Sequence, residues 1–565
     1  MSDEYLDAEG RPVDALAQST LCGAFDRTVR EQRGRPAQRT LDGSVEFTFE
    51  EYADRVRAVA TGLHSLGVRR GDTVGIMLRN RPEFGVADAA AMHLGAVGYS
   101  IYNTSSPAQI AEIMANAGNR VLVTEVMMLP RVLVAAPPSL EHVVLVDGTA
   151  DGTMTLAELA SRPSRGFRYE DAWREVRPDD VVTLIYTSGT TGPPKAVQIT
   201  HSGVLTEARA MVRAMPYQRG GNSISYLPSA HVGDRTLNHY VGSICLGRTM
   251  TSVEDHRRIG EALVRVRPEV FGGVPRVWEK LKAGLESAGV HDPAALPEAV
   301  RATVRARIGL DRMVWSVSSA APIAPDVLGF FESLGVRVRE GWGMSETTCL
   351  VTLNPLDAPR PGTVGRALPG AEIRVLEDGE LAVRGPLVMK GYRNDPAQTA
   401  EAVDGDGWLH TGDVATIDGD GYVTIVDRKK ELIINSAGKN MSPANIEFRL
   451  RASSPLIAQA VCIGDRRPYN VALLVLDPEI AARWAAGRGR PSGPEARASD
   501  PELHAELEAA VERANAALSR VEQVKRFGLI AAEWAPGGDE LTPTSKLKRR
   551  VIAAKYATEI ERLYR

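Results

Sequence analysis

A short segment rich in hydroxyl groups and glycine is the part of the sequence best suited to hold an anion. Glycine permits backbone angles that other residues resist, so successive N–H groups can turn inward beside the hydroxyls and form a concave phosphate site. The P-loop of NTPases has its lysine directly after the last glycine, whereas two prolines intervene here. We therefore predict a phosphate loop of another kind, with a plain polar surface loop as the alternative. Its residues are Thr187, Ser188, Gly189, Thr190, Thr191, Gly192 and Lys195.

Alternating segments must position this loop. Residues 181–186 form an apolar, β-rich run that leads directly into the loop, which predicts a strand ahead of it. From about Phe47 to Glu125, helical patterns (52–66 and near 84–94) alternate with strand-like ones (73–77 and 121–124), and the rhythm resumes from 181 to about 343. Such alternation predicts an α/β fold in which helices are layered on a sheet.

The last third of the sequence has a different texture. Residues 372–376 and 380–383 flank Glu377-Asp378-Gly379, which predicts a β-hairpin and a small β-rich layer. After Asp427, short strands (432–434, 460–463 and 471–476) precede a helix, which predicts a compact α+β terminal domain. One face of that helix carries Leu503, Leu507, Val511, Ala514, Leu518 and Val521. Residues 486–499 are rich in Gly, Pro and Arg and predict a solvated loop.

Composition limits the function classes. A chain of 565 residues with 44% hydrophobic content can bury a large core in several domains or subdomains. A net charge of −4, from 67 basic and 71 acidic residues, gives no basic field for nucleic acid, so we expect small-molecule partners. The four cysteines (Cys22, Cys245, Cys349, Cys462) form no C-x-x-C pair, which predicts neither a zinc cluster nor a disulfide framework. The scattered cysteines favour the reduced cytoplasm. The acidic start and the absence of a membrane-length apolar run predict a protein that is not integral to a membrane, with peripheral association at the inner membrane surface left open.

Six further motifs follow the loop in order: YLPSAHV (226–232), SSAAPI (318–323), EGWGMSETT (340–348), GWLHTGD (407–413), VDRKKELIINSAGKNMSP (426–443) and LTPTSKLKRR (541–550). Together the seven motifs resemble the adenylate-forming (AMP-binding) superfamily of acyl-CoA synthetases, luciferases and peptide-synthetase adenylation domains. The resemblance spans about residues 21–550. It implies a large N-terminal domain (1–429) of layered α/β subdomains plus a β-rich subdomain. A small mobile α+β C-terminal domain (430–565) would carry the catalytic lysine.

Adenylation explains why these residue types are needed. A carboxylate is a weak nucleophile and ATP is anionic, so attack at the α-phosphorus requires charge neutralisation and alignment. By the resemblance, the loop holds the β- and γ-phosphates, Glu346 binds Mg²⁺ and Ser345, where the family usually has Thr, keeps a hydroxyl for the α-phosphate. Trp342 replaces the Tyr or Phe that stacks on adenine. The other nucleotide-binding positions that the resemblance implies are Ala320, Ala321, Gly343, Gly438 and the ribose ligands Asp413 and Arg428.

The resemblance also gives catalytic roles. Lys546 aligns with the catalytic lysine, with Lys548 as the register-shifted alternative, and Lys430 stands at the hinge two residues after the ribose-binding arginine. His231 either lies near the reacting carboxylate or is a satisfied core histidine. Simpler readings exist for Glu346 as a helix-start carboxylate, for Trp342 as a core aromatic and for Asp413 as a turn residue.

Four stretches resemble long-chain fatty acid CoA ligases: VFGGVPRVWEKL (270–281), YRNDPAQTAEA (392–402), GKNMSPANIE (438–447) and the helical stretch ending VEQVKRF (521–527). Only about thirty residues separate Trp278 from Ile308, where those enzymes carry a longer helical arm, so the acyl chain length stays open. We predict an ATP- and Mg²⁺-dependent ligase that activates a medium- to long-chain fatty acid as acyl-AMP and transfers it to CoA. The alternatives are a fatty acyl-AMP ligase that loads a carrier protein, an aryl-acid CoA ligase and a non-catalytic nucleotide-binding protein. The oligomeric state does not follow from the sequence.

Overall fold

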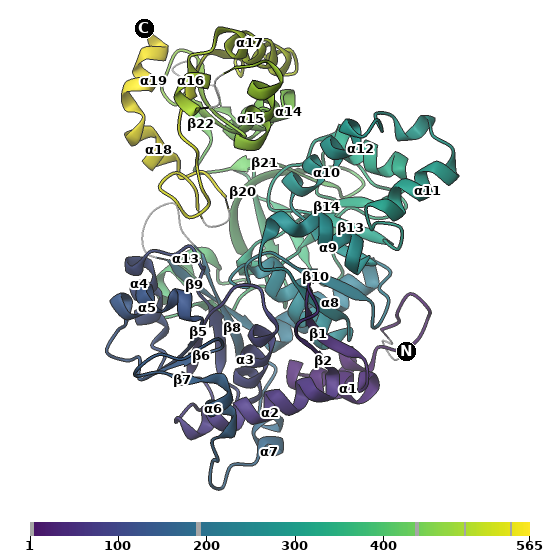
Figure 1. The fold of residues 1–565 in the computed structure, drawn as a ribbon, viewed down its shortest axis with the longest axis vertical. Helices are drawn as coiled ribbons and strands as arrows, with labels where there is room; N and C mark the ends of the chain where they lie inside the picture. The colour runs from purple at the N-terminus through teal and green to yellow at the C-terminus, as the bar shows by residue number, and fades with distance from the viewer. Residues whose placement is uncertain (1–4, 188–193, 435–439, 491–492, 543–544) are drawn as a thin grey trace. The chain divides into compact units, whose positions relative to one another are not determined.

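The computed structural model describes residues 5–187, 194–434, 440–490, 493–542 and 545–565. The chain divides into two compact units, and Figure 1 labels many of their helices and strands. The first unit contains Met1–Arg374, Ala382–His410 and Ile417–Val423, and the second contains Val375–Leu381, Thr411–Thr416 and Thr424–Arg565.

An eight-stranded sheet with the order β19-β9-β8-β4-β3-β5-β6-β7 organises the first unit, and Figure 1 labels its strands β9, β8, β5, β6 and β7. The strands from β8 to β7 in this order pair in parallel, and β9 turns back antiparallel beside β8. This confirms the predicted α/β fold, and β3 and β5 have the predicted bounds. The strands are β3 (Thr73–Met77), β4 (Val97–Ser100), β5 (Val121–Thr124), β6 (His142–Leu145), β7 (Met154–Thr155), β8 (Val181–Thr187), β9 (Lys195–Thr200) and β19 (Gly391–Tyr392).

Helices supply the crossovers that parallel strands require. The α2 helix begins with a capping box, in which the Thr48 side chain accepts from Glu51 N and the Glu51 side chain accepts from Thr48 N. The helices of this unit are α1 (Leu21–Gln32), α2 (Phe49–Ser65), α3 (Pro82–His93), α4 (Pro107–Ala117), α5 (Leu129–Ala135), α6 (Leu156–Ser161), α7 (Tyr169–Arg174), α8 (His201–Ala214), α9 (Ile259–Val266), α10 (Pro275–Ser287), α11 (Glu298–Arg307), α12 (Pro325–Leu334), α13 (Pro396–Ala402) and the π-helix η3 (Asp234–Cys245).

Two further sheets belong to the first unit. One has the order β10-β11-β1-β2 and the other the order β12-β13-β14-β15-β16, in which β12, β13 and β14 are parallel. Their strands are β1 (Pro36–Thr40), β2 (Glu46–Thr48), β10 (Asn222–Ser225), β11 (Thr249–Ser252), β12 (Val270–Gly273), β13 (Trp315–Ser318), β14 (Val338–Trp342), β15 (Thr352–Leu353) and β16 (Arg366–Ala367). The parallel strands β13 and β14 therefore end at the same edge of their sheet.

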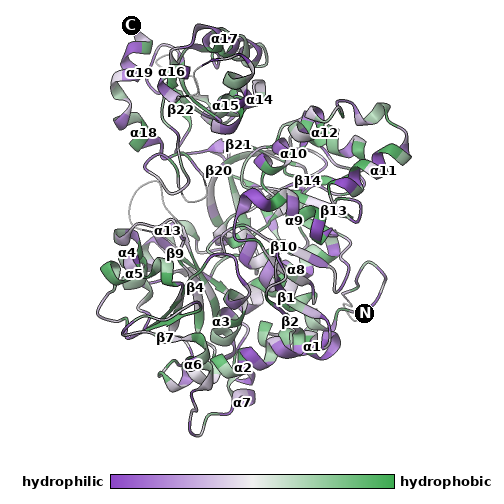
Figure 2. Ribbon diagram, viewed as in Figure 1, coloured by the Kyte–Doolittle hydropathy of each residue, from purple (hydrophilic) through white to green (hydrophobic). Residues whose placement is uncertain are grey.

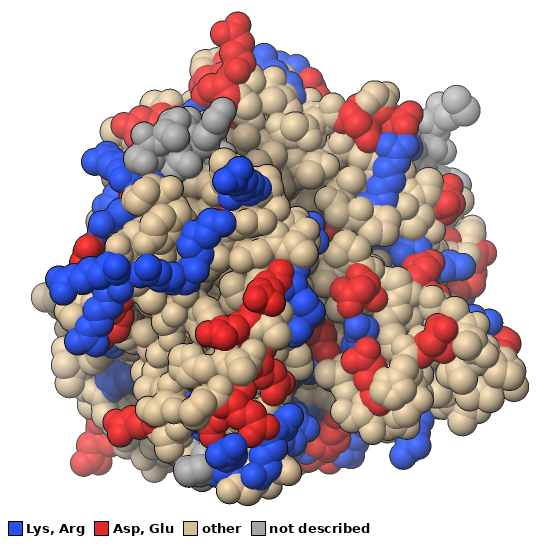
Figure 3. Space-filling view, turned by 90° about the horizontal axis from the view of Figure 1, so that it is seen from above, with Lys and Arg blue, Asp and Glu red and all other residues tan. Residues whose placement is uncertain are grey.

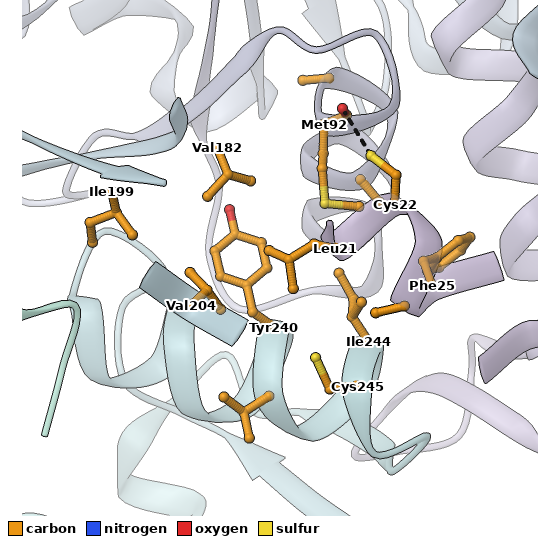
Figure 4. Packing of buried hydrophobic residues seen from close by; sticks show 14 of the residues in the cluster. Leu21, Cys22, Phe25, Met92, Val182, Ile199, Val204, Tyr240, Ile244 and Cys245 are labelled. Carbon is orange, nitrogen blue, oxygen red and sulfur yellow. Dashed lines mark hydrogen bonds between the residues drawn. The ribbon is translucent and has the colours of Figure 1, made fainter. Parts of the chain in front are cut away.

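Side chains from α1, α3, α8, η3, β8 and β9 meet in one buried cluster (Figure 4). Within it, Cys22 Sγ donates a hydrogen bond to the carbonyl oxygen of Met92 at 3.4 Å. All four cysteines are buried as free thiols. Figure 2 shows the mixed hydropathy of the amphipathic helix α2, whose apolar residues face this core.

A four-stranded sheet has the order β17-β18-β20-β21, with β17 (Glu372–Val375), β18 (Glu380–Arg384), β20 (Leu409–Ile417) and β21 (Val423–Arg428). The predicted hairpin between β17 and β18 forms, because Gly379 adopts a positive φ of 84° and Leu376 N donates to Glu380 O at 2.8 Å. In the second unit, the sheet β24-β25-β26 packs with α14 and α17. The elements that follow β21 are β22 (Ile433–Ile434), β23 (Asn440–Met441), α14 (Pro443–Ser453), β24 (Ile457–Ile463), β25 (Asn470–Leu476), α15 (Pro478–Gly487), α16 (Pro494–Ala498), α17 (Pro501–Ala516), β26 (Val524–Ile530), α18 (Arg549–Lys555) and α19 (Ala557–Tyr564).

The predicted helical stretch through residues 521–527 is wrong. The α17 helix ends at Ala516, and residues 524–530 form β26, which pairs in parallel with β25. Asn515 fixes the change of direction because its side chain accepts from Val524 N at 2.9 Å and donates to Val524 O at 2.8 Å. Val521, which the helical period placed on the buried face, is 46% exposed.

The prediction of a solvated loop over residues 486–499 also needs correction. The short helix α16 forms within this stretch, and Arg497 is buried, with its Nε donating to Gly493 O at 3.4 Å. The Gly, Pro and Arg content indicates only the average solvent exposure of the segment. It therefore does not reveal that one of its arginines is buried.

The surface carries charges of both signs. On the face shown in Figure 3, Lys and Arg side chains lie among Asp and Glu side chains. Within the described ranges, we find no helix long and apolar enough to cross a membrane, and no group of three or more His, Cys, Asp or Glu side chains that could hold a metal ion.

Candidate active site

The predicted phosphate loop joins two antiparallel strands. Thr187 ends β8 and Lys195 begins β9, and these two residues are partners in the register of the pair. The loop therefore closes a β-hairpin, whereas the P-loop opens a helix. Of the residues assigned to it, Ser188, Gly189, Thr190, Thr191 and Gly192 lie outside the described residues, as does Gly438 of the later motif.

Glu346 and Lys195 are joined through a tyrosine. The hydroxyl of Tyr392 donates a hydrogen bond to Glu346 Oε1 at 2.9 Å, and Lys195 Nζ lies 5.0 Å from the centroid of the Tyr392 ring. Glu346 is 8% exposed and Tyr392 is 9% exposed. A carboxylate and an ammonium group, from segments 151 positions apart in the sequence, thus contact one side chain.

The backbone around Glu346 is tightly constrained. Ser345–Thr347 form a single 3₁₀ turn after β14, so Glu346 does not start a regular helix as the simpler reading assumed. A Cβ at Gly343 would lie 1.6 Å from the carbonyl oxygen of Cys349, so only glycine fits there. Met389 N donates to Glu346 O at 2.8 Å. These contacts fix the direction in which the Glu346 side chain leaves the backbone.

The residues predicted to surround the adenine and the α-phosphate follow β13 and β14. Ala320, two residues after the end of β13, has a φ of +74°, and Ala321 is exposed. Trp342 ends β14 and is half-buried, with its ring packed against the cluster of Val351, Val383 and Leu387. Because β13 and β14 are parallel neighbours, these positions share one sheet edge, which is where ligands bind in open α/β sheets.

The two predicted ribose ligands are in contact. Arg428 Nε lies 2.6 Å from Asp413 Oδ1, with Asp413 buried and Arg428 half-exposed. Lys429 pairs with Asp378 and Glu380, and its backbone N donates to Gly412 O at 2.8 Å. The exposed Lys430 follows in the turn that leaves β21.

The two lysines considered for the catalytic role have different surroundings. Lys548 Nζ donates to the carbonyl oxygen of Gly538 at 2.8 Å and is half-buried. Lys546 is exposed, and its backbone is held by reciprocal bonds with Thr542: Lys546 N donates to Thr542 Oγ1 at 3.0 Å, and Thr542 N donates to Lys546 O at 2.8 Å. The hydrogen bond from Lys548 Nζ to Gly538 O holds the Lys548 side chain against the backbone.

His231 lies at the start of a buried polar network. Its Nδ1 accepts a hydrogen bond from Gly233 N at 3.1 Å, and the ring is half-buried. The π-helix η3 follows. Such helices are rare in proteins, and those that occur often lie at functional sites. The local hydrogen bond is compatible with both readings of His231, the substrate contact and the structural histidine.

Arg235, which the sequence did not single out, anchors the segment that carries His231. It is fully buried, pairs with Asp88 of α3 and donates to Ser100 Oγ at 2.8 Å and to Ser229 O at 3.2 Å. Although burial opposes ionisation of Asp88, the charge of Arg235 holds its pKa at about 2. The sequence signal was the Asp-Arg pair that directly follows the YLPSAHV motif and one glycine.

Tyr392 is the second functional candidate that the sequence analysis missed. It begins the stretch YRNDPAQTAEA, which served there only as a point of resemblance to long-chain ligases. Its contact with Glu346 depends on the path of the chain between residues 346 and 392, so no spacing rule could have revealed it.

Two family models together match most of the chain. A family model described as AMP-binding enzyme matches residues 25–393, and one described as AMP-binding enzyme C-terminal domain matches residues 430–565. A candidate fatty-acid–CoA ligase of Mycobacterium tuberculosis, fadD11, is 48% identical over 452 residues, which cover 74% of this chain and 79% of the relative.

A second relative matches almost the whole chain. The long-chain-fatty-acid–CoA ligase FadD15 of Mycobacterium bovis is 34% identical over 568 residues, 93% of this chain and 94% of that protein. Among solved structures, the adenylation domain of a carboxylate reductase from Mycobacterium chelonae aligns with a TM-score of 0.78 at 22% identity, and the alignment covers 98% of this chain and 92% of that one. The last comparison supports the fold.

Proposed function

Because this chain belongs to the AMP-binding enzyme family and is related over nearly its whole length to a long-chain-fatty-acid–CoA ligase, we propose that it is an ATP-dependent fatty acid:CoA ligase. The observation that carries the proposal is this full-length relationship together with an intact set of charged residues, Lys195, Glu346, Asp413 and Lys546. The substrates are a medium- to long-chain fatty acid, ATP and CoA.

The reaction has two balanced steps. A carboxylate oxygen of the acid attacks the α-phosphorus, the bond from that phosphorus to the leaving oxygen breaks, and acyl-AMP and pyrophosphate result. The sulfur of CoA then attacks the acyl carbon, the carbon–oxygen bond to AMP breaks, and the thiol proton is released as acyl-CoA and AMP form. Both steps need positive charge where negative charge develops.

We assign the triphosphate and the metal to the first unit. Lys195 and the loop 187–192 would hold the β- and γ-phosphates, and the Glu346 carboxylate would hold Mg²⁺, with Ser345 near the α-phosphate. The donor set fits Mg²⁺, which prefers carboxylate and phosphate oxygens, and the bound cation would neutralise phosphate charge. The hydrogen bond from Tyr392 to Oε1 supports this role because it orients the carboxylate.

The remaining roles complete the proposal. Trp342, beside Ala320, Ala321 and Gly343, would stack on adenine, and Asp413 and Arg428 would bind the ribose. We propose that residues 1–429 form the nucleotide- and acyl-binding domain and residues 430–565 a mobile domain that brings Lys546 to the reacting carboxylate. Lys430 would be its hinge, and His231 would lie near the acyl group. A cytoplasmic location is the corresponding expectation, testable by cell fractionation.

A substrate panel tests the proposal. Acids of increasing chain length, together with benzoate-type acids, are assayed for acid-dependent exchange of pyrophosphate into ATP and for thioester formation. Each buried methylene adds about 0.8 kcal/mol, so kcat/KM should rise roughly fourfold per methylene until the acyl site is filled. An optimum with aryl acids, or a profile that is flat with chain length, would contradict the fatty-acid assignment.

The same panel decides the acceptor. CoA and a phosphopantetheinylated carrier protein are offered in parallel reactions, and the proposal expects thioester formation on CoA. Transfer to the carrier protein alone would identify a fatty acyl-AMP ligase instead. Binding of ATP with neither exchange nor transfer would identify a nucleotide-binding protein without catalysis.

A further inference from the structure

We propose that Tyr392 is a positioning residue that holds Glu346 and Lys195 in their working orientations. The inference rests on the proposed function, because it concerns the two side chains assigned there to Mg²⁺ and to the phosphates. Tyr392 would bind neither the acid nor the nucleotide, and would act through the two charged groups that it contacts.

The geometry joins two kinds of contact in one side chain. The hydroxyl donates to Glu346 Oε1 at 2.9 Å, and a hydrogen bond to an ionised acceptor is among the stronger ones. The face of the ring lies 5.0 Å from Lys195 Nζ, within the range of a cation–π contact. Because Tyr392 is 9% exposed, both contacts are formed away from bulk water, where electrostatic interactions are strengthened.

The backbone holds Tyr392 in place independently of these contacts. The β19 strand is an edge of the eight-stranded sheet and pairs antiparallel with β9, with Tyr392 opposite Val197. Tyr392 N donates to Thr399 Oγ1 at 2.9 Å, and Arg393 N donates to Ala196 O at 2.9 Å. The ring is therefore anchored beside the strand that begins with Lys195.

The turn that carries Glu346 is tied to the same segment. Met389, three residues before Tyr392, donates its backbone N–H to Glu346 O at 2.8 Å. The Glu346 backbone and one carboxylate oxygen are thus both bonded to residues 389–392. By donating to Oε1, the hydroxyl of Tyr392 fixes the orientation of the carboxylate that would hold Mg²⁺.

The competing explanation is that Tyr392 only packs. It belongs to the large buried cluster of the first unit, and a core tyrosine can be retained for its ring alone. Tyr392→Phe separates the two explanations because it keeps the ring, the packing and the contact with Lys195 and removes only the hydroxyl.

The first measurement is the Mg²⁺ dependence of pyrophosphate exchange. If Tyr392 positions Glu346, Tyr392→Phe should raise the Mg²⁺ concentration for half-maximal exchange by about tenfold, the value expected for the loss of a hydrogen bond to a charged group. Calorimetric titration with Mg·ATP should show a weakening of the same order. Tyr99→Phe is the matched control, since its buried hydroxyl donates to Asn119 Oδ1 at 2.7 Å, and it should leave both quantities unchanged.

The second measurement is a double-mutant cycle with Glu346→Gln. When the charge of Glu346 is absent, Tyr392→Phe should change Mg·ATP affinity by less than about twofold. An unchanged Mg²⁺ dependence in Tyr392→Phe, or an equal loss with and without the Glu346 charge, would overturn the proposal and leave packing as the explanation.

The outcomes for the two proposals are distinguishable. If the wild-type protein shows no acid-dependent exchange, the proposed function fails. Titration of Mg·ATP into the four proteins of the double-mutant cycle still tests whether Tyr392 positions Glu346. If the wild type is active and Tyr392→Phe behaves like Tyr99→Phe in every measurement, the function stands and the inference about Tyr392 is wrong.

Discussion

Removing the charge of Glu346 without changing its shape separates a metal ligand from a structural carboxylate. Glu346→Gln should lower Mg²⁺-dependent exchange by about 100-fold, because a metal contact contributes several kcal/mol to transition-state stabilisation. The melting temperature should stay near that of the wild type, since Tyr392 can still donate to the amide oxygen. Glu372→Gln, at an exposed position, is the control. If turnover persists and only stability changes, Glu346 has a structural role.

Glu207 gives the folded protein a pH-dependent stability. It is fully buried on α8, its Oε1 accepts from Leu350 N at 3.1 Å, and burial raises its pKa to about 8. The unfolded chain has a glutamate pKa of about 4.3, so between these values only the folded state holds the proton. The protonated Glu207 side chain therefore contributes its full share to the free energy of unfolding below about pH 4.3. This share is lost as the pH rises to about 8, and the free energy of unfolding falls by up to about 1.4 kcal/mol per pH unit.

Glu207→Gln tests this sign. Glutamine keeps an acceptor for Leu350 and cannot lose a proton, so the variant should gain stability relative to the wild type between pH 5 and pH 8. The measurement is the free energy of unfolding in urea at several pH values. Parallel curves for the two proteins would show that Glu207 is not protonated in the folded state.

At the scale of elements, the attachment of η3 to α3 depends on a buried ion pair. Asp88 of α3 contacts Arg235, and its Oδ2 lies 3.1 Å from His239 Nε2, all three side chains being at most 1% exposed. The carboxylate also reaches β4, because a Cβ at Gly98 would lie 2.4 Å from Asp88 Oδ1. One carboxylate thus joins α3 to η3 and lies close against the backbone of β4.

Asp88→Asn should cost about 3–5 kcal/mol of stability, because it leaves the Arg235 charge buried without a counter-charge. Urea unfolding measures this as a lower midpoint with an unchanged slope. Asp255→Asn, which breaks an exposed pair with Arg257, should change the midpoint little. Equal effects of the two substitutions would mean that the buried pair is not what holds η3.

At the scale of the whole molecule, different substitutions should block adenylation and the transfer of the acyl group to CoA. Lys546→Ala removes the positive charge that we propose acts in adenylation. It should lower pyrophosphate exchange by about 100-fold while still converting supplied acyl-AMP and CoA to acyl-CoA. Lys548→Ala is the control, because its Nζ is bonded to Gly538 O. If Lys548→Ala loses more pyrophosphate exchange than Lys546→Ala, the catalytic lysine is Lys548.

Lys430→Pro should give the opposite result. Proline restricts φ at the proposed hinge, so exchange should persist while transfer of the acyl group to CoA is lost. Lys430→Ala, which keeps the backbone freedom, should retain both steps. If Lys430→Pro and Lys546→Ala lose the same step, the two-conformation mechanism does not apply to this protein.

The sequence by itself determined the family, the α/β class and many element bounds. Seven motifs in a fixed order identified the AMP-binding enzymes, and the family models and relatives confirm them. The strands at 73–77 and 121–124 were predicted residue for residue, because a buried strand is a local run of apolar residues. The roles of Lys195, Glu346, Asp413, Arg428 and Lys546 stay predictions from motif order.

Only the tertiary structure decided which side chains meet. The contact of Tyr392 with Glu346 and the pairing of Asp88 with Arg235 join residues 46 and 147 positions apart, and local propensity carries no information about such partners. The helical period likewise extended α17 beyond Ala516, because it does not register the side-chain bonds of Asn515 to β26. Short-range patterns are set by steric preference and burial within a segment, whereas the site depends on where the chain returns, and that is fixed by packing across the whole unit.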